Sequence, residues 1–283
     1  MATERIYHYT TVDSLALILK TRTLRFTRLD GVDDVREAQQ HIGIDFGKYF
    51  FVSCWTQEEA ESIPQWNMYS REMQGVRLEL PVYPFGNAPL RPPERWSGVG
   101  LEGDINSPLS FEALWGPTYF VVPLFFRRDY FAGPVQYVAS VRDVYARSVQ
   151  REILPTGAVT IRIEALPTLP RHKSQEWHFQ KEYRFSLFIV PSLPMPPEGP
   201  GAQAFSERIG QHLSQSLINN VDHGIKYFDV PLDSSVLKDL VVRIGPLCTA
   251  GSQACVEALI SRFAPDARIE SSALSGSIRS RGR

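Results

Sequence analysis

The stretch IYHYT, residues 6–10, decides how this chain begins to fold. Its aromatic and β-branched residues are typical of a strand, yet a histidine stands in the middle. Because side chains alternate between the two faces of a strand, His8 shares a face with Ile6 and Thr10, and the two tyrosines share the other. Polar side chains on a buried strand need hydrogen-bond partners. We therefore expect this strand to end at a cleft, where a ligand ribose supplies such partners.

Outward from this strand, the pattern predicts many strands and few helices. Thr10 or Thr11 can cap a helix with an apolar run at 15–19, and Ser62 with Pro64 marks a second helix start. The remaining predicted helices cover 141–152, 205–217 and 251–263, and the predicted strands cover 24–27, 48–55, 76–80, 136–139, 182–190, 226–230, 240–244 and 267–271. Strands that do not alternate regularly with helices favour an α+β fold over a doubly wound parallel one.

With 43% hydrophobic residues the chain can build a large core, in one large domain or two small ones, and we expect a single domain over residues 1–283. Within it we expect an irregular insertion at 81–118, a proline-rich loop at 191–201 and a flexible tail at 276–283. A net charge of −1 leaves no electrostatic footprint for non-specific nucleic-acid binding. Three irregularly spaced cysteines, no signal peptide and no long apolar run predict a cytoplasmic protein without membrane contact.

A second polar string, WHFQKEYR at residues 177–184, runs into the strongest predicted strand. Strand alternation would place Gln180, Glu182 and Arg184 on one face, where Arg184 or Lys181 would keep the carboxylate ionised. An exposed strand edge with alternating charges explains the pattern equally well. The chemical case is that cleaving an N-glycosidic bond develops positive charge on the ribose, which a nearby carboxylate stabilises.

Two further strings have a structural and a functional interpretation. In WNMYSR, residues 66–71, an aromatic pair at i, i+3 is usually core packing; alternatively Tyr69 offers its face to a planar heterocycle and Arg71 reaches a phosphate. The acidic turn at 33–37 lacks the ligand spacing of a calcium loop, so we interpret it as a solvated turn in which Asp34 caps a helix. No metal site is predicted.

Taken in order, these strings resemble a bacterial family named domain of unknown function 2971. The matching strings are YHYT at 7–10, DDVRE at 33–37, SCWT at 53–56, Trp66 to Tyr69, GVRL at 75–78, the 177–184 string and IGP at 244–246. The resemblance covers nearly the whole chain, through the order of its motifs. Gln180 departs from it by replacing a glutamate, and the turn at 33–37 matches imperfectly.

That family in turn looks like the ADP-ribosyltransferase superfamily, which includes bacterial toxins and phage-defence proteins. The resemblance implies split antiparallel β-sheets with flanking helices and a cleft between them. Carried over residue by residue, it implies that His8 holds the NAD ribose, that Tyr69 (or Tyr9) lies near nicotinamide, and that Glu182 aids catalysis while Gln180 orients the acceptor. With the residues nominated from their type and position, the candidate catalytic residues are Glu182, Gln180 and Tyr69, and the candidate NAD-binding residues are His8, Tyr9, Thr10, Trp66, Arg71 and Arg184.

The leading hypothesis is thus an NAD-dependent ADP-ribosyltransferase with NAD as its substrate. Its macromolecular acceptor would be RNA, DNA or protein, and a toxin or antiviral defence role would add an antitoxin or a phage protein as partner. Two alternatives stay open: an NAD glycohydrolase that uses water as acceptor, and a non-enzymatic module of the same fold that senses a nucleotide or a phage protein.

Overall fold

The computed structural model describes residues 4–91, 105–153, 157, 159–192 and 202–279. Its helices are α1 (Val12–Thr21), α2 (Ile63–Tyr69), α3 (Arg128–Phe131), α4 (Val141–Ser148), α5 (Ala202–Ile218) and α6 (Ala250–Phe263). Its strands are β1 (Arg5–Thr10), β2 (Thr23–Arg28), β3 (Gln40–His41), β4 (Ile44–Asp45), β5 (Phe50–Thr56), β6 (Val76–Pro81), β7 (Ala88–Pro89), β8 (Asn106–Ser107), β9 (Tyr119–Val122), β10 (Ala132–Pro134), β11 (Gln136–Val138), β12 (Val149–Ile153), β13 (Val159–Ile163), β14 (His172–Ser174), β15 (Glu182–Pro191), β16 (Tyr227–Pro231), β17 (Val241–Ile244) and β18 (Arg268–Ser271).

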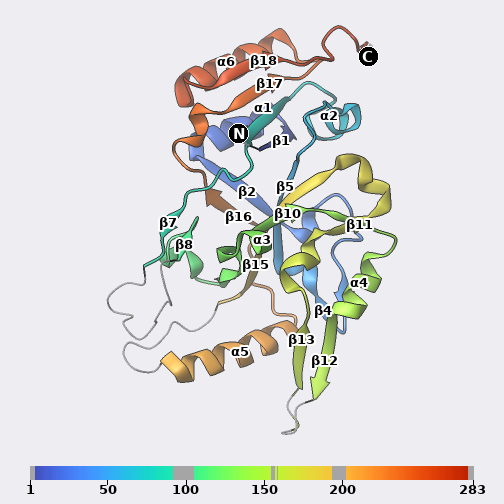
Figure 1. The fold of residues 1–283 in the computed structure, drawn as a ribbon, viewed down its shortest axis with the longest axis vertical. Coiled ribbons are helices and arrows are strands. Elements are labelled where there is room, and N and C mark those ends of the chain that lie inside the picture. Colours follow the sequence, from blue (N-terminus) through green and yellow to red (C-terminus); the bar gives the residue numbers. More distant parts are fainter. Residues whose placement is uncertain (1–3, 92–104, 154–156, 158, 193–201, 280–283) are drawn as a thin grey trace.

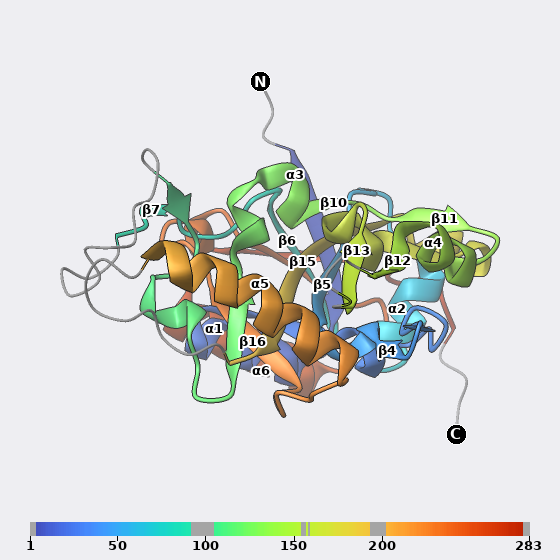
Figure 2. The same ribbon diagram turned by 90° about the horizontal axis from the view of Figure 1, so that it is seen from below.

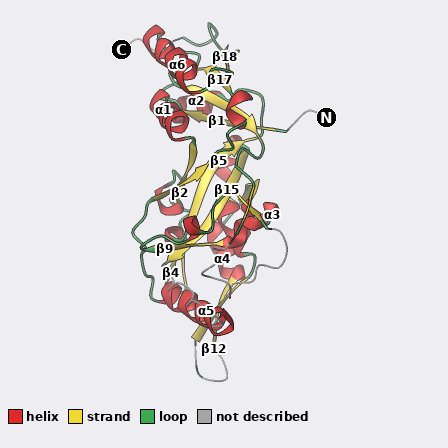
Figure 3. Ribbon diagram, turned by 90° about the vertical axis from the view of Figure 1, so that its left-hand side faces the viewer, coloured by secondary structure: helices red, strands yellow, loops and turns green. Residues whose placement is uncertain are grey.

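Most of these strands join one large, mainly antiparallel sheet. Within the described residues it has ten strands, with the order β10-β15-β5-β1-β6-β17-β18 and with β2, β16 and β9 attached beside that path. Helices α1 and α6 pack together at the end that holds β17 and β18, whereas α5 lies at the opposite end against β13 and β15 (Figures 1 and 3). In the view from below, α5 therefore lies in front of α1 and α6 (Figure 2). The expected α+β class is confirmed.

The sheet is weakly joined at its centre. Strand β1 pairs with β6 along its whole length, from Arg5 opposite Pro81 to Thr10 opposite Val76. On its other side it pairs with β5 through a single residue pair, Tyr7 opposite Thr56. Beyond that pair β1 and β5 diverge. We call this place the seam, and it divides the sheet into a β1-β6-β17-β18 part and a part built around β5 and β15.

Local sequence signals explain where the first helices begin. The Thr11 side chain accepts a hydrogen bond from the Ser14 amide and caps α1. Ser62 caps α2 in the same way, and Pro64 occupies its first turn, where no amide donor is required. Both predicted starts are confirmed, and they fix the ends of α1 and α2 close to β1.

The long strand β15 forms the centre of the core. Every residue from Arg184 to Pro191 is buried, because β5, β9 and β10 pair with it and helices cover its faces. Phenylalanine rings fill the space around it; Phe85, Phe131 and Phe185 contact one another with ring centroids 4.9–5.4 Å apart. The predicted strand at 182–190 is confirmed, and its first residues are held in place by this packing.

Some sequence predictions need correction. Helix α4 ends at Ser148, and the last four residues of the helix predicted at 141–152 belong to strand β12, which forms a hairpin with β13. In the tail that we expect to be flexible, Ile278 packs on Trp66 and its neighbours, and the flexibility itself stays a prediction. The insertion predicted at 81–118 contains the short strands β7 and β8; its residues 92–104, the 193–201 part of the proline-rich loop and residues 280–283 lie outside the described residues.

Candidate functional site

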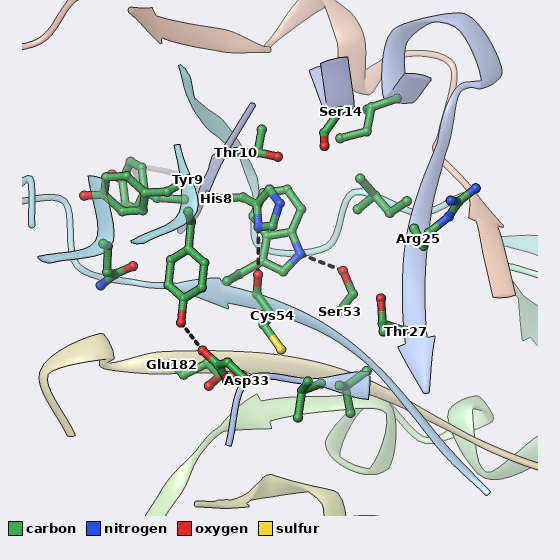
Figure 4. Close-up of a pocket in the computed structure, with 18 of the residues that line it drawn as sticks. His8, Tyr9, Thr10, Ser14, Arg25, Thr27, Asp33, Ser53, Cys54 and Glu182 are labelled. Carbon is green, nitrogen blue, oxygen red and sulfur yellow. Dashed lines mark hydrogen bonds between the residues drawn. The ribbon is translucent and has the colours of Figure 1, made fainter. Parts of the chain in front are cut away.

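A cavity of about 430 Å³ opens where β1 and β5 diverge (Figure 4). Its walls come from β1, α1, β2 and β5, with the loop that follows β2, helix α2 and the ends of β14 and β15 closing one side. The residues that carry its polar chemistry are His8, Thr10, Ser14, Arg25, Asp33, Ser53, Cys54, Tyr69, Lys173, Gln180, Glu182 and Asp229. The volume lies within the range of small-molecule sites.

His8 reaches across the seam from β1. Its Nδ1 lies 2.9 Å from the main-chain oxygen of Cys54, which β1 leaves unpaired because the two strands have diverged. A carbonyl only accepts, so Nδ1 carries the proton and Nε2 is left as an acceptor. Burial lowers the pKa of His8, and the ring, 5.0 Å from that of Trp55, is neutral at pH 7. His8 thus offers a fixed hydrogen-bond acceptor suited to a hydroxyl.

Glu182 begins β15 on the other side of β5, and its carboxylate is held by two cations. Oε1 lies 2.7 Å from the Arg184 guanidinium and Oε2 lies 3.3 Å from Lys173 Nζ. Burial acts to raise the pKa of Glu182, but Arg184 and Lys173 outweigh it and bring that pKa below its usual value. The carboxylate is therefore ionised at neutral pH, although only 5% of the side chain is exposed.

Two more carboxylates join the same two cations. Lys173 Nζ lies 3.2 Å from Asp33 Oδ1 and 3.2 Å from Glu37 Oε1, and Arg184 lies 2.5 Å from Glu37 Oε2. These five residues, Asp33, Glu37, Lys173, Glu182 and Arg184, form what we call the charge network. Three carboxylates against two cations leave one negative charge in excess, and of the five side chains only that of Asp33 is substantially exposed, at 30%.

Tyr69 links the charge network to Gln180. Its hydroxyl donates to Asp33 Oδ2 and accepts from Gln180 Nε2. The amide orientation is fixed, since a hydroxyl that already donates to a carboxylate has only lone pairs left for Gln180. The other end of that amide, Oε1, is buried and has no hydrogen-bond partner among the described residues. Gln180 is itself only 4% exposed, so the cavity wall holds an unsatisfied acceptor.

The opposite end of the cavity contains hydroxyls and one arginine. Arg25 forms two hydrogen bonds to Asp229, of 2.9 and 3.0 Å, and stacks 3.8 Å above the Tyr227 ring. Figure 4 shows Arg25 and Ser14 on the far side of the cavity from Asp33 and Glu182. The two ends differ in charge: Arg25 matches the charge of Asp229 at this end, whereas the charge network at the other end has one negative charge in excess.

Six of the residues singled out from the sequence line this one cavity, namely His8, Tyr9, Thr10, Tyr69, Gln180 and Glu182. One geometric expectation is wrong. Gln180 does not precede Glu182 along a strand; it ends the 3₁₀-helix Gln175–Gln180, and Lys181 adopts a left-handed conformation with φ of 45° before β15 starts. Both side chains still line the cavity.

Three predicted NAD-binding residues lie outside the cavity wall. Trp66 is fully buried, packs edge-on against Tyr9 at 4.9 Å and donates to Glu61, so its core interpretation holds. The exposed Arg71 pairs with Asp13 at 3.1 Å. Arg184 is buried in the charge network, where it fixes Glu182.

Sequence reasoning missed Lys173 and misjudged the acidic turn. The turn is not a solvated helix cap, since Asp34 and Glu37 are 4% and 1% exposed and no helix starts at Val35. The pairing of Lys173 with a carboxylate 140 positions earlier depends on tertiary structure alone. One signal in the sequence could have indicated the buried network: the turn holds more acidic residues than the cap of one helix requires.

No group of three or more histidine, cysteine or acidic side chains in the described part of the chain is arranged to hold a metal ion. None of its described helices is long and apolar enough to span a membrane. Comparison with protein-family models, with curated proteins and with solved structures found no match.

Proposed function

We propose that this protein is an NAD-dependent ADP-ribosyltransferase that modifies a macromolecule. The observation that carries the proposal is that His8 and Glu182, from distant parts of the sequence, line one cavity in the protonation states this chemistry needs. A neutral imidazole accepts from a ribose hydroxyl, and an ionised carboxylate stabilises positive charge on that ribose.

The bond that breaks joins ribose C1′ to the nicotinamide nitrogen. Its electron pair leaves with that nitrogen and converts the cationic ring to neutral nicotinamide, while positive charge develops on the ribose. Glu182, ionised and fixed by Arg184 and Lys173, faces this charge without having to reorganise. An oxygen or nitrogen of the acceptor then bonds to C1′ and releases its proton to solvent.

The wall of the cavity fits NAD in three respects. The unsatisfied Oε1 of Gln180 can accept from the carboxamide group of nicotinamide or from the acceptor nucleophile. The Tyr69 ring, with its hydroxyl tied at both sides, presents a fixed aromatic surface. Arg25 at the far end binds Asp229 through Nε and Nη2, and the Nη1 side of its guanidinium can donate to a phosphate.

The seam also supports the proposal at the level of the fold. A large antiparallel sheet that separates into two parts around a single β1–β5 pair corresponds to the split sheets implied by the resemblance to ADP-ribosyltransferases. The cavity lies in that split, with His8 on one part and Glu182 on the other. A toxin or phage-defence role, with an antitoxin or phage protein as partner, is the corresponding biological proposal.

Incubation with NAD labelled in its adenine ring, together with total cell lysate, tests this activity. Glu182→Gln keeps the size of the side chain and removes its charge, so we expect at least about a hundredfold loss of label transfer. Glu164→Gln, a change on an exposed side chain, is the matched control and retains transfer. Equal transfer by wild type and by folded Glu182→Gln protein would remove Glu182 from the mechanism.

Hydrolysis of NAD is the second candidate, and one observation favours it. Gln180 is a neutral amide whose buried oxygen can hold a water molecule, and it has no charge with which to deprotonate a macromolecular nucleophile. Free labelled ADP-ribose with no labelled macromolecule identifies a hydrolase. NAD binding without either product identifies the third alternative, a sensing module.

A further inference from the structure

One end of the cavity carries an excess negative charge, and cleavage of NAD with the help of Glu182 does not by itself require it. The charge network holds three carboxylates and two cations, and the Asp33 side chain is its one substantially exposed member. Glu37 and Glu182 are 1% and 5% exposed and each contacts both cations, so their charges are closely matched. The excess negative charge is therefore presented to a ligand at Asp33.

Further charges around the turn do not cancel this excess. Arg36, the arginine within the turn, pairs with Asp34 and Glu176 at 3.2 and 3.3 Å and does not line the cavity. Arg25, at the other end, is occupied by Asp229. Burial acts to raise the pKa of Asp33, but the hydrogen bond from Tyr69 and the charge of Lys173 outweigh burial and bring that pKa below its usual value. This carboxylate therefore stays ionised.

A second and independent feature points to a ligand at the same place. Tyr69 joins Asp33 to Gln180, and the amide oxygen of Gln180 is buried in the cavity wall without a hydrogen-bond partner among the described residues. A buried acceptor left unsatisfied costs free energy that a ligand donor recovers. A primary carboxamide on a positively charged ring satisfies both groups, since it donates to Gln180 and brings a cation close to Asp33.

From this arrangement we infer that Asp33 makes the site selective for the oxidised, cationic nicotinamide ring and against the neutral, reduced ring. The inference rests on the proposed function and adds a specificity-determining residue to it. Oxidised and reduced NAD share their ribose, phosphate and adenine groups and differ only at the nicotinamide ring, which on reduction gains a hydrogen at C4 and loses its positive charge. A preference that depends on Asp33 therefore reports on the charge facing that ring.

Calorimetric titration at pH 7.5 tests the inference by binding rather than by turnover. Wild-type protein is expected to bind oxidised NAD at least about tenfold more tightly than reduced NAD, since an opposite charge a few ångströms away in a partly buried site is worth more than that factor. Asp33→Asn keeps an acceptor for Tyr69 and removes the excess charge, so the ratio falls to within about threefold of one. Asp129→Asn, on an exposed side chain outside the cavity, is the matched control and keeps the wild-type ratio.

A second pair of probes needs no variant. The N-methylnicotinamide cation should compete with oxidised NAD more strongly than neutral nicotinamide does. Equal binding of oxidised and reduced NAD, or equal competition by the two small probes, overturns the selectivity of Asp33 and leaves the proposed function standing. Failure of oxidised NAD to bind wild-type protein at millimolar concentration overturns both.

Discussion

Lys173 Nζ lies 3.2 Å from Asp33 Oδ1 and 3.3 Å from Glu182 Oε2, so one buried ammonium joins the turn after β2 to the first residue of β15. Burial acts to lower the pKa of Lys173, but the carboxylates around it raise that pKa well above its usual value. The residue therefore stays charged, and it sets the distance between the two carboxylates to which we assign ligand-directed roles.

Removing that ammonium should destabilise the fold. Lys173→Met leaves three carboxylates facing the single guanidinium of Arg184, and breaking a buried ion pair on one side costs about 3–5 kcal/mol. Urea denaturation followed by fluorescence measures the free energy of unfolding. Lys20→Met, at an exposed position on α1, is the control and should change it by less than about 0.5 kcal/mol. A loss no larger than that of the control would mean that the charge network does not hold these segments together.

The substitution His8→Asn keeps the donor that bonds the Cys54 oxygen and removes the acceptor that we assign to the ligand. An asparagine amide can still donate to the Cys54 oxygen, whereas the acceptor at Nε2 is lost. We expect the Kd for NAD to rise about tenfold, which corresponds to one hydrogen bond of about 1.4 kcal/mol. His212 also bonds a main-chain oxygen, at 3.1 Å, but does not line the cavity, so His212→Asn should leave the Kd unchanged. An unchanged Kd in His8→Asn would place His8 outside the ligand contacts.

Stability should fall as the pH drops below about 6.5. Burial lowers the pKa of His8, His172 and His223 below the unfolded value. The unfolded chain then binds more protons than the folded chain does, so the free energy of unfolding rises with pH in this range and is lost as pH falls below the unfolded pKa of about 6.5. Thermal unfolding at pH 7.5 and at pH 5.5 measures the effect. A midpoint that does not decrease at pH 5.5 would contradict burial of neutral histidines.

Replacing Trp66 by phenylalanine should lower stability, whereas replacing Trp55 by phenylalanine should weaken NAD binding. Trp66 is fully buried and donates to Glu61, so Trp66→Phe leaves that buried carboxylate short of a donor; we expect a loss of about 1–3 kcal/mol in stability and an unchanged Kd for NAD. Trp55 lies against the His8 ring at 5.0 Å and lines the cavity, so Trp55→Phe should weaken NAD binding. Weaker NAD binding by stable Trp66→Phe protein would restore the ligand role that its burial excludes.

More of the fold than of the candidate site could be predicted from the sequence, and particular residues show why. Strand alternation and caps are local, so the starts at Thr11 and Ser62 and the strand at 182–190 could be predicted from neighbouring residues. Gln180 and Glu182 were placed on one strand because alternation says nothing about a left-handed residue between them, and Lys181 is such a residue.

The charge network could not be predicted from the sequence, because its members come from distant positions and meet only in the folded structure. Nothing near Lys173 in the sequence identifies Asp33 as its partner, and an acidic turn is more often solvated than buried. Arg184 could be assigned to Glu182 from spacing, but its full burial depends on β10, β5 and the 3₁₀-helix Leu166–Arg171, whose Pro170 oxygen accepts from Arg184. His8 was singled out because polar groups inside a strand need partners, and that argument required no tertiary information.

The seam between Tyr7 and Thr56 has an evolutionary consequence. Where β1 and β5 separate, the main-chain oxygen of Cys54 is not paired with β1 and instead accepts a hydrogen bond from His8 Nδ1. Point substitution replaces side chains and leaves peptide groups in place. The contact that fixes the His8 ring is therefore inherited with the topology, so substitutions around the opening can change the cavity wall while the same oxygen continues to hold His8.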